Sequence, residues 1–367
     1  MIIDAYITTR SIDFVNITII TDTDSFLTIT NNEKSVKIKN PDISFRKLFY
    51  YQYQWRNSQS DSSINLNIIQ GDYNIQLKTS LLLPLEGEKI TRFGILADPH
   101  INDENINYLP QSTKRLYGQA NYLCKKYIQR LKELKADFII FPGDVLDKGA
   151  PHYLQTAQKI LSQSQISCYP IIGNHEEYGL VNREDFYKAF SIPKEGYYSF
   201  TKQNIHFIML NTPDQSALNN NTEQFHWLKN QLDKYGFSHN VLLFSHFSLI
   251  LHPCVQGWKN DGLQQMYNYQ EVLNLFKKYQ GVKIFFAGHK NVPSRIVKDG
   301  INHLLCPQLI QAPCGFYLVD VYEKGLLCSY YEIDEKHYVQ ISRNAYVKNW
   351  KERCGTEESR NFVLTWL

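Results

Sequence analysis

Five short apolar stretches of the sequence are each followed at once by side chains that can bind a metal ion or move a proton. The stretches are RFGILA, FIIFP, CYPII, VLLFS and KIFFA, and the candidate ligands that follow them are Asp98, His100, Asp144, Asn174, His246 and His289. Short apolar runs of this kind are typical of buried strands. Because ligands bind beyond the carboxyl ends of the strands in open α/β sheets, we expect these side chains to meet at one edge.

The residue types in this set point to a class of metal. Carboxylates, imidazoles and one amide form a mixed oxygen and nitrogen donor set, which suits Zn, Fe, Mn or Co better than Ca. One carboxylate can also bridge two cations about 3.5–4 Å apart, as in two-metal hydrolases. Taken singly, each histidine or Gly-Asp pair has a commoner explanation as a structural histidine or a turn. Their occurrence at five strand ends favours a metal centre.

The elements that must hold these side chains change character along the chain. Residues 1–85 alternate apolar with polar and Thr residues between Asp- and Asn-rich turns, which predicts a small all-β sandwich domain. Residues 86–90 are predicted to be a linker. Residues 91–367 alternate short apolar strands with amphipathic helices. The expected class of this second domain is α/β, with helices covering the sheets.

The helices of the second domain are predicted from apolar residues that recur every three or four positions. This spacing occurs in residues 114–137, 222–235 and 269–279. The tail is predicted to return to strands, including the stretch HYVQI at residues 337–341.

The composition excludes several classes of protein. Of the 367 residues, 43% are hydrophobic and 20% charged, as in an ordinary globular protein, and the net charge of +3 does not indicate a nucleic-acid-binding surface. The seven scattered cysteines lack disulfide or metal spacing and are expected to be reduced. The sequence shows no signal-peptide pattern and no run of roughly 18 apolar residues. We therefore expect a cytoplasmic protein that does not enter membranes.

The polar stretches at the strand ends carry a resemblance to a known family. Asp98-Pro99-His100, Gly143-Asp144 with Asp147, Gly173-Asn174-His175-Glu176, Ser245-His246 and Gly288-His289 resemble, in order and spacing, the motifs of the calcineurin-like metallophosphoesterases. The resemblance covers residues 91–335 and implies a four-layer αββα sandwich. Within this family, the Asn174-His175 motif and the compact loops resemble those of the class III cyclic nucleotide phosphodiesterases. The N-terminal module resembles the small sandwich that precedes the catalytic domain in purple acid phosphatase-like members.

The resemblance implies a role for each matching position. Asp98 and His100 would bind a first metal, Asp144 would bridge two metals, and Asn174, His246 and His289 would bind the second. A hydroxide held between two ions of Mn, Fe or Zn would attack phosphorus in line. His175 would act on the leaving group as a proton donor or by stabilising charge. Asp147 and Glu176 would orient ligands or cap turns.

One position departs from the family pattern. The last motif normally ends in a histidine that completes the first metal's ligands, whereas this chain has Asn291. Three interpretations follow. Asn291 coordinates the first metal through its amide oxygen, or a water or nearby residue takes the missing place. In the third, the first metal binds weakly and the protein works with one metal or hardly at all. Loss of an imidazole should favour harder ions such as Mn or Mg.

The resemblance predicts a hydrolase of small phosphate esters, with phosphodiesters favoured over phosphomonoesters. The alternative is a metal-deficient, weakly active or inactive relative that serves as a binding scaffold because of Asn291. His152 and His252 lie close in sequence to the site loops and are candidate substrate contacts. The N-terminal domain is a candidate for binding a protein or polymer partner.

Overall fold

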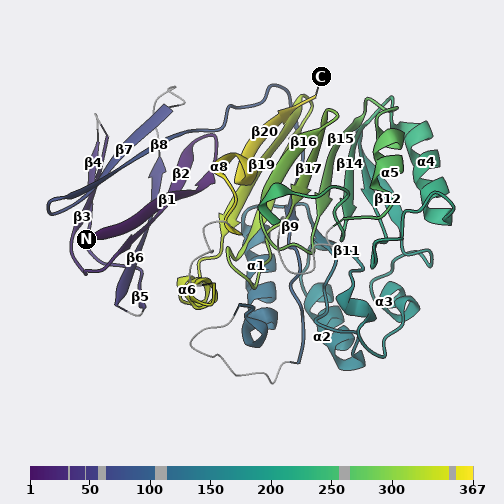
Figure 1. Ribbon diagram of the computed structural model, residues 1–367, viewed down its shortest axis with the longest axis horizontal. Helices are drawn as coiled ribbons and strands as arrows, with labels where there is room; N and C mark the ends of the chain where they lie inside the picture. The colour runs from purple at the N-terminus through teal and green to yellow at the C-terminus, as the bar shows by residue number, and fades with distance from the viewer. Residues whose placement is uncertain are drawn as a thin grey trace.

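The computed structural model describes residues 1–31, 34–45, 47–56, 63–103, 114–255, 265–346 and 353–366. Its described strands form two four-stranded sheets near the N-terminus and two six-stranded sheets in the remainder (Figure 1). No helix in these described ranges is both long enough and apolar enough to span a membrane.

The N-terminal strands form a sandwich of two antiparallel sheets. One sheet contains, in order, β1 (Ile2–Arg10), β2 (Phe14–Thr21), β6 (Leu48–Arg56) and β5 (Ile43–Phe45), and the other contains β4 (Ser35–Ile38), β3 (Leu27–Thr30), β7 (Ser63–Gln70) and β8 (Tyr73–Ser80). The alternating pattern of β2 buries Val15, Ile17 and Ile19 against Trp55 of β6. This burial accounts for the period-two pattern of the sequence.

Each of the two larger sheets contains a run of adjacent parallel strands. The first contains, in order, β11 (Ser167–Ile171), β10 (Phe138–Pro142), β9 (Lys89–Ile95), β18 (Gly315–Tyr322), β19 (Gly325–Glu332) and β20 (Asn361–Thr365). The second contains, in order, β12 (Tyr198–Lys202), β13 (Ile205–Met209), β14 (Asn240–Ser245), β15 (Val282–Ala287), β17 (Ile301–Leu305) and β16 (Ser294–Lys298). Strands β9, β10 and β11 are mutually parallel, as are β13, β14, β15 and β17.

Helices cover the outer faces of these two sheets. The first sheet packs against α1 (Ala120–Glu133), α2 (Pro151–Ser162) and α3 (Arg183–Ala189), and the second against α4 (Glu223–Tyr235) and α5 (Tyr269–Phe276). Alternate residues of β10 show the arrangement, because Ile139 and Phe141 face the helices while Phe138 and Ile140 face the other sheet. The four-layer αββα sandwich predicted from the sequence is therefore confirmed.

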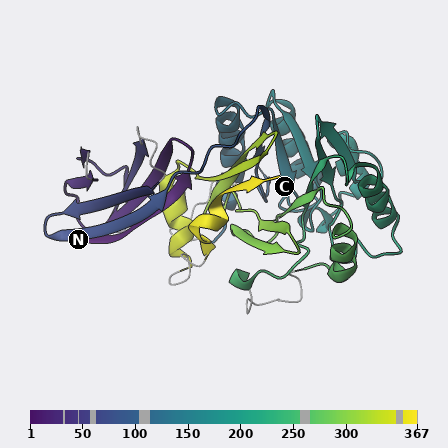
Figure 2. The same cartoon turned by 90° about the horizontal axis from the view of Figure 1, so that it is seen from above.

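The C-terminal segment lies between the N-terminal sandwich and the larger sheets (Figure 2). It includes α6 (Lys336–Asn344) and α8 (Glu357–Arg360). The Arg360 guanidinium donates to the carbonyl of Ile7 at 2.7 Å, and the side-chain oxygen of Asn361 accepts from the backbone N–H of Arg10 at 3.0 Å. These polar contacts join the two sandwiches. The predicted linker, residues 86–90, follows β8 and overlaps the start of β9.

One predicted strand is wrong. The stretch HYVQI at residues 337–341 lies within the helix α6 rather than in a strand. The helix buries Val339, Gln340 and Arg343, and Arg343 shares a face with the other two because it lies four and three positions after them. The charge of Arg343 is paired with the buried Glu332, so a charged residue takes a buried position of the helix. The apolar residues of this stretch therefore do not recur at the spacing that predicts a helix.

Two buried histidines of the second sheet should make the fold sensitive to acid. Burial lowers the pKa of His206 and of His303 to about 4, whereas an unfolded histidine has a pKa of about 6.5. The folded state therefore binds fewer protons than the unfolded state between these values. We expect the free energy of unfolding to have its full value above pH 6.5. It should fall, by up to about 3 kcal/mol for each histidine, as the pH drops to 4.

A His303→Leu variant tests this acid sensitivity. Neither ring nitrogen of His303 has a hydrogen-bond partner among the described residues, so leucine removes the titrating group without breaking a hydrogen bond. Urea unfolding at pH 7.0 and 4.5 should show a smaller loss of stability in acid than in the parent protein. The exposed His226→Leu variant is the matched control and should keep the parent slope. An unchanged slope in His303→Leu would show that His303 does not contribute.

Candidate metal centre

The strand ends bring the predicted ligands together. Strands β9, β10 and β11 end side by side in the first sheet, and β14 and β15 end side by side in the second. The backbone N–H of His100 donates to the carbonyl of Asp144 at 3.1 Å, which ties the first two loops to each other. Two groups of side chains result, each able to hold an ion: His100, Asp144 and His175, and Asp144, His246 and His289. Asp144 belongs to both.

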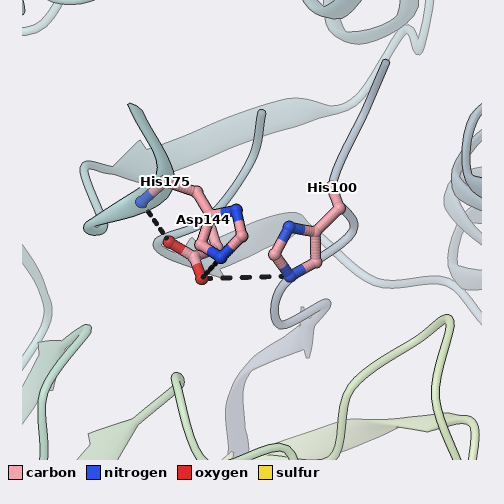
Figure 3. A group of neighbouring side chains, drawn as sticks. All are labelled: His100, Asp144 and His175. Carbon is pink, nitrogen blue, oxygen red and sulfur yellow. Dashed lines mark hydrogen bonds and ion pairs between the residues drawn. The ribbon is translucent and has the colours of Figure 1, made fainter. Parts of the chain in front are cut away.

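The first group surrounds one oxygen of Asp144 (Figure 3). The Nε2 atoms of His100 and His175 lie 3.9 and 4.0 Å from Oδ2 of Asp144. Nδ1 of His175 lies 2.6 Å from the carbonyl oxygen of Asp147, which can only accept, so Nδ1 carries the proton and Nε2 faces Asp144 with its lone pair. Both ring nitrogens of buried His100 lack a hydrogen-bond partner among the described residues.

Asn174 joins His246 and Asp144 of the second group to place three lone pairs around one point. Nδ1 of His246 donates to the carbonyl of Pro142 at 3.0 Å, so the neutral ring presents a lone pair at Nε2. That Nε2 lies 2.9 Å from Oδ1 of Asn174 and 3.2 Å from Oδ1 of Asp144. Burial lowers the pKa of His246 and so favours the neutral ring. Three acceptors without a hydrogen among them repel one another unless a cation lies between them, which is the arrangement that a metal ion requires.

Electrostatics of the site fit a cation as well. Burial raises the pKa of Asp98 well above its ordinary value, and the neighbouring charge of Asp144 raises it further. Burial also acts to raise the pKa of Asp144, but the nearby imidazoles of His246, His100 and His175 hold it below its ordinary value. Two buried carboxyl groups this close stay ionised together only if positive charge is supplied.

Asp98 lies differently from the other predicted ligands. Its carboxylate accepts the backbone N–H of His289 at 3.1 Å to Oδ1 and 3.2 Å to Oδ2. It is not in either of the two metal-ligand groups of the described residues. It therefore joins the loop after β15 to the loop after β9 at the edge of the site.

Asn291 is buried with its amide oriented. Its Nδ2 donates to the carbonyl of His289 at 3.0 Å, while its Oδ1 has no hydrogen-bond partner among the described residues. A buried amide oxygen without a partner costs about 1–3 kcal/mol. A cation on Oδ1 would remove this cost, which favours the first of the three interpretations of Asn291, coordination through its own oxygen.

The loops that carry the ligands are held in conformations that side chains rarely adopt. Positive φ angles of 47–65° occur at five positions of the site, Asp98, His100, Asp144, His289 and Asn291. Each costs of order 1–3 kcal/mol and persists where the surrounding structure imposes it, commonly at functional sites. Glycine is required beside them, because a Cβ on Gly143 would lie 2.3 Å from Nδ1 of His246 and one on Gly173 would lie 2.4 Å from Oδ1 of Asp144.

Glu176 fixes two of these loops to each other. Its Oε1 accepts from the backbone N–H of Leu146 and its Oε2 from that of Gly173, both at 2.7 Å. The side chain is buried, and burial followed by the charge of Asp144 raises its pKa to about 8. Glu176 thus joins the loop after β10 to the loop after β11 through two hydrogen bonds.

A Glu176→Ala variant should lose about 2–5 kcal/mol of unfolding free energy, because two buried N–H groups lose their acceptor. Urea unfolding of the metal-free protein measures this loss. The neighbouring Glu177→Ala is the matched control: Glu177 pairs with Arg183 on the surface at 2.9 Å, and such pairs contribute less than about 1 kcal/mol. Equal effects of the two substitutions would contradict the positioning role.

The remaining predicted residues lie at different distances from the ligands. Oδ1 of Asp147 lies 3.5 Å from Nδ1 of His100 and 3.7 Å from Nδ1 of His175. His152 is exposed at the start of α2 beside Tyr153. His252 is buried with Nδ1 2.9 Å from the hydroxyl of Ser294. No hydrogen bond or ion pair of the described residues joins His152 or His252 to the candidate ligands.

A cation that no sequence motif indicates lies beside the site. Arg115 donates from Nε to Gln311 at 3.0 Å and from Nη1 to the hydroxyl of Tyr117 at 2.9 Å. Its charge acts to lower the pKa values of Asp98 and Asp147, although burial raises both. Arg115 lies in a polar stretch with no motif, so the sequence offered no signal for its position.

Comparisons with known proteins bear on the same part of the chain. A sequence model described as calcineurin-like phosphoesterase matches residues 91–293, more than half of the chain. A probable cyclic nucleotide phosphodiesterase of Ruthia magnifica is 24% identical over 64% of this chain and 95% of its own length. A manganese-dependent ADP-ribose/CDP-alcohol diphosphatase of Oryza sativa is 24% identical over 65% of this chain and 91% of its own length.

A solved structure shares the fold. A dimetal phosphatase from Danio rerio superposes with a TM-score of 0.58 and 17% identity, over 76% of this chain and all of the other.

Proposed function

Because the chain belongs to the calcineurin-like phosphoesterases and is a hydrolase of that family, we propose that it cleaves phosphodiesters at two metal ions bound at the strand ends. The convergence of lone pairs from His246, Asn174 and Asp144 on one point carries this proposal. Members of the family use divalent metals, and the rice relative is named as manganese-dependent.

The candidate ligands divide into two sets that share Asp144. The first ion would be held by Asp98, His100, Asp144 and Asn291, and the second by Asp144, Asn174, His246 and His289. Bound metal ions supply a nucleophile at neutral pH by lowering the pKa of water, and they neutralise phosphoryl oxygens. Manganese is the ion we favour, because the oxygen-rich first set replaces an imidazole with an amide oxygen.

His175 is the side chain placed to move a proton to the leaving oxygen. Its Nδ1–H is fixed by the carbonyl of Asp147, and its Nε2 faces the space beside Asp144. The ring is partly exposed, at 18% of its side-chain surface, so a substrate oxygen can reach Nε2. Protonation of Nε2 would convert the ring to an imidazolium, which would pass that proton to the departing alkoxide.

Hydrolysis of bis(p-nitrophenyl) phosphate by the manganese-reconstituted protein tests the proposal. We expect release of p-nitrophenol with a higher kcat/KM than for p-nitrophenyl phosphate, and loss of activity when EDTA removes the metal. A protein that releases no p-nitrophenol with Mn, Zn or Fe would instead fit the binding-scaffold alternative.

A second candidate reaction is cleavage of a diphosphate bond. It is favoured by Arg115, a partly buried cation held beside the site by Gln311 and Tyr117, which can pair with a second phosphate group. The rice relative is named as a diphosphatase. Measuring kcat/KM for ADP-ribose and for cyclic AMP distinguishes diphosphate cleavage from phosphodiester cleavage. In an Arg115→Met variant, kcat/KM should fall for ADP-ribose only. Cytoplasmic location and a partner of the N-terminal domain stay predictions.

A further inference from the structure

An exposed aromatic ring lies beside the candidate leaving-group histidine. Tyr178 ends the turn η2 (His175–Glu177) that follows β11, and 57% of the residue is exposed. Its ring centroid lies 5.1 Å from that of His175, with the two planes inclined by 53°. This exposed ring therefore adjoins the group that the proposed function places at the leaving oxygen.

The hydroxyl of Tyr178 is nevertheless held in place. It accepts a hydrogen bond from Nδ2 of Asn174 at 2.8 Å. The other end of the same amide, Oδ1, lies 2.9 Å from Nε2 of His246 in the candidate second metal set. An amide that rotated by half a turn would present N–H groups to the metal instead of a lone pair. Because a hydroxyl both donates and accepts, the hydroxyl of Tyr178 holds the amide of Asn174 in place, and a bound metal ion selects the orientation whose oxygen faces it.

We propose that Tyr178 determines substrate specificity: its ring stacks on the base of a nucleotide whose phosphate lies at the metal centre, while its hydroxyl holds the side chain of Asn174 in place beside that centre. This inference rests on the proposed function, because it takes the phosphate to lie beside His175. The flat ring is fixed at its hydroxyl end and open on its surface, so a base can cover it without a loss of ring mobility. Base–aromatic stacking tolerates any base, since each base has a π-face.

The stacking part is tested by binding of two ligands that differ only in the base. AMP and ribose 5-phosphate are titrated into the manganese-loaded full-length protein by calorimetry at low temperature. We expect AMP to bind roughly five- to a hundredfold more tightly than ribose 5-phosphate. The ratio should fall to near one in Tyr178→Leu and persist in Tyr178→Phe. Tyr73→Leu, at a similarly exposed tyrosine of β8, is the control and should keep the parent ratio.

The orienting part is tested by metal binding. Tyr178→Phe removes only the hydroxyl, so the affinity for the manganese ion of the second set, which includes Asn174, should fall by roughly ten- to a hundredfold while the AMP preference remains. A ratio near one in the parent protein, or an unchanged ratio in Tyr178→Leu, would overturn the stacking role. Unchanged metal affinity in Tyr178→Phe would overturn the orienting role. Both measurements are independent of turnover, so absence of hydrolysis would count against the proposed function and not against Tyr178.

Discussion

Replacement of Asp144 by asparagine is expected to lower kcat for bis(p-nitrophenyl) phosphate by roughly a thousandfold or more. Oδ1 of Asp144 faces the second set of ligands and Oδ2 faces the first, so one side chain serves both sites. An asparagine keeps the shape but removes the negative charge and one of the two acceptor oxygens. The loss corresponds to several kcal/mol of stabilisation by the metals in the transition state. Steady-state kinetics in excess manganese measures it.

The matched control for Asp144→Asn is Asp72→Asn. Asp72 lies in the exposed turn between β7 and β8, so the substitution changes net charge by the same amount far from the site. The control should keep kcat and KM within twofold of the parent values. If Asp144→Asn also keeps full activity, Asp144 does not bridge two metals, and the division of ligands into two sets is wrong.

Replacement of Asn291 by alanine is expected to lower the affinity for one of the two manganese ions by about ten- to a hundredfold. The reason is that Oδ1 of Asn291 is buried without a protein partner while Nδ2 is held by the carbonyl of His289. Alanine removes the oxygen ligand, whereas Asn291→His replaces it with the imidazole usual in the family. Titration of the metal-free protein with manganese, followed by activity, gives the two dissociation constants.

The pair of substitutions separates the interpretations of Asn291. If Asn291 is a ligand, alanine weakens the first site and histidine retains or strengthens it. If a water or another residue fills the position, alanine leaves both dissociation constants unchanged. If the first metal is weakly bound in the parent protein, histidine alone raises the affinity and the activity. The buried, unpaired oxygen predicts the first of these outcomes.

The layers of the fold could be predicted because burial leaves a simple pattern in the sequence. The strands of the larger sheets are buried on both faces, so runs such as FIIFP and VLLFS are continuously apolar. The strands of the N-terminal sandwich alternate because one face packs inward. The helix α6 could not be predicted in the same way, since its buried face includes Gln340 and Arg343.

The identity of the candidate ligands could be predicted, but not their orientation. The order of the motifs identified Asp144, Asn174 and His246 as residues of one site. The direction of each lone pair depends on contacts between segments far apart in sequence, such as the hydrogen bond from His246 to Pro142, 104 positions away. The contact of Asp98 with the backbone of His289 has the same origin. Arg115 and Tyr178 were missed because an isolated arginine or tyrosine has no periodicity or motif.

The central claim is that one rim of the αββα sandwich binds two metal ions through a shared carboxylate. Elemental analysis of the protein after reconstitution with manganese and removal of excess metal tests it most directly. We predict about two manganese ions per chain in the parent protein, with far less than two in Asp144→Asn under the same conditions. Absence of bound metal in the parent protein, or an unchanged content of two ions in Asp144→Asn, would contradict the claim.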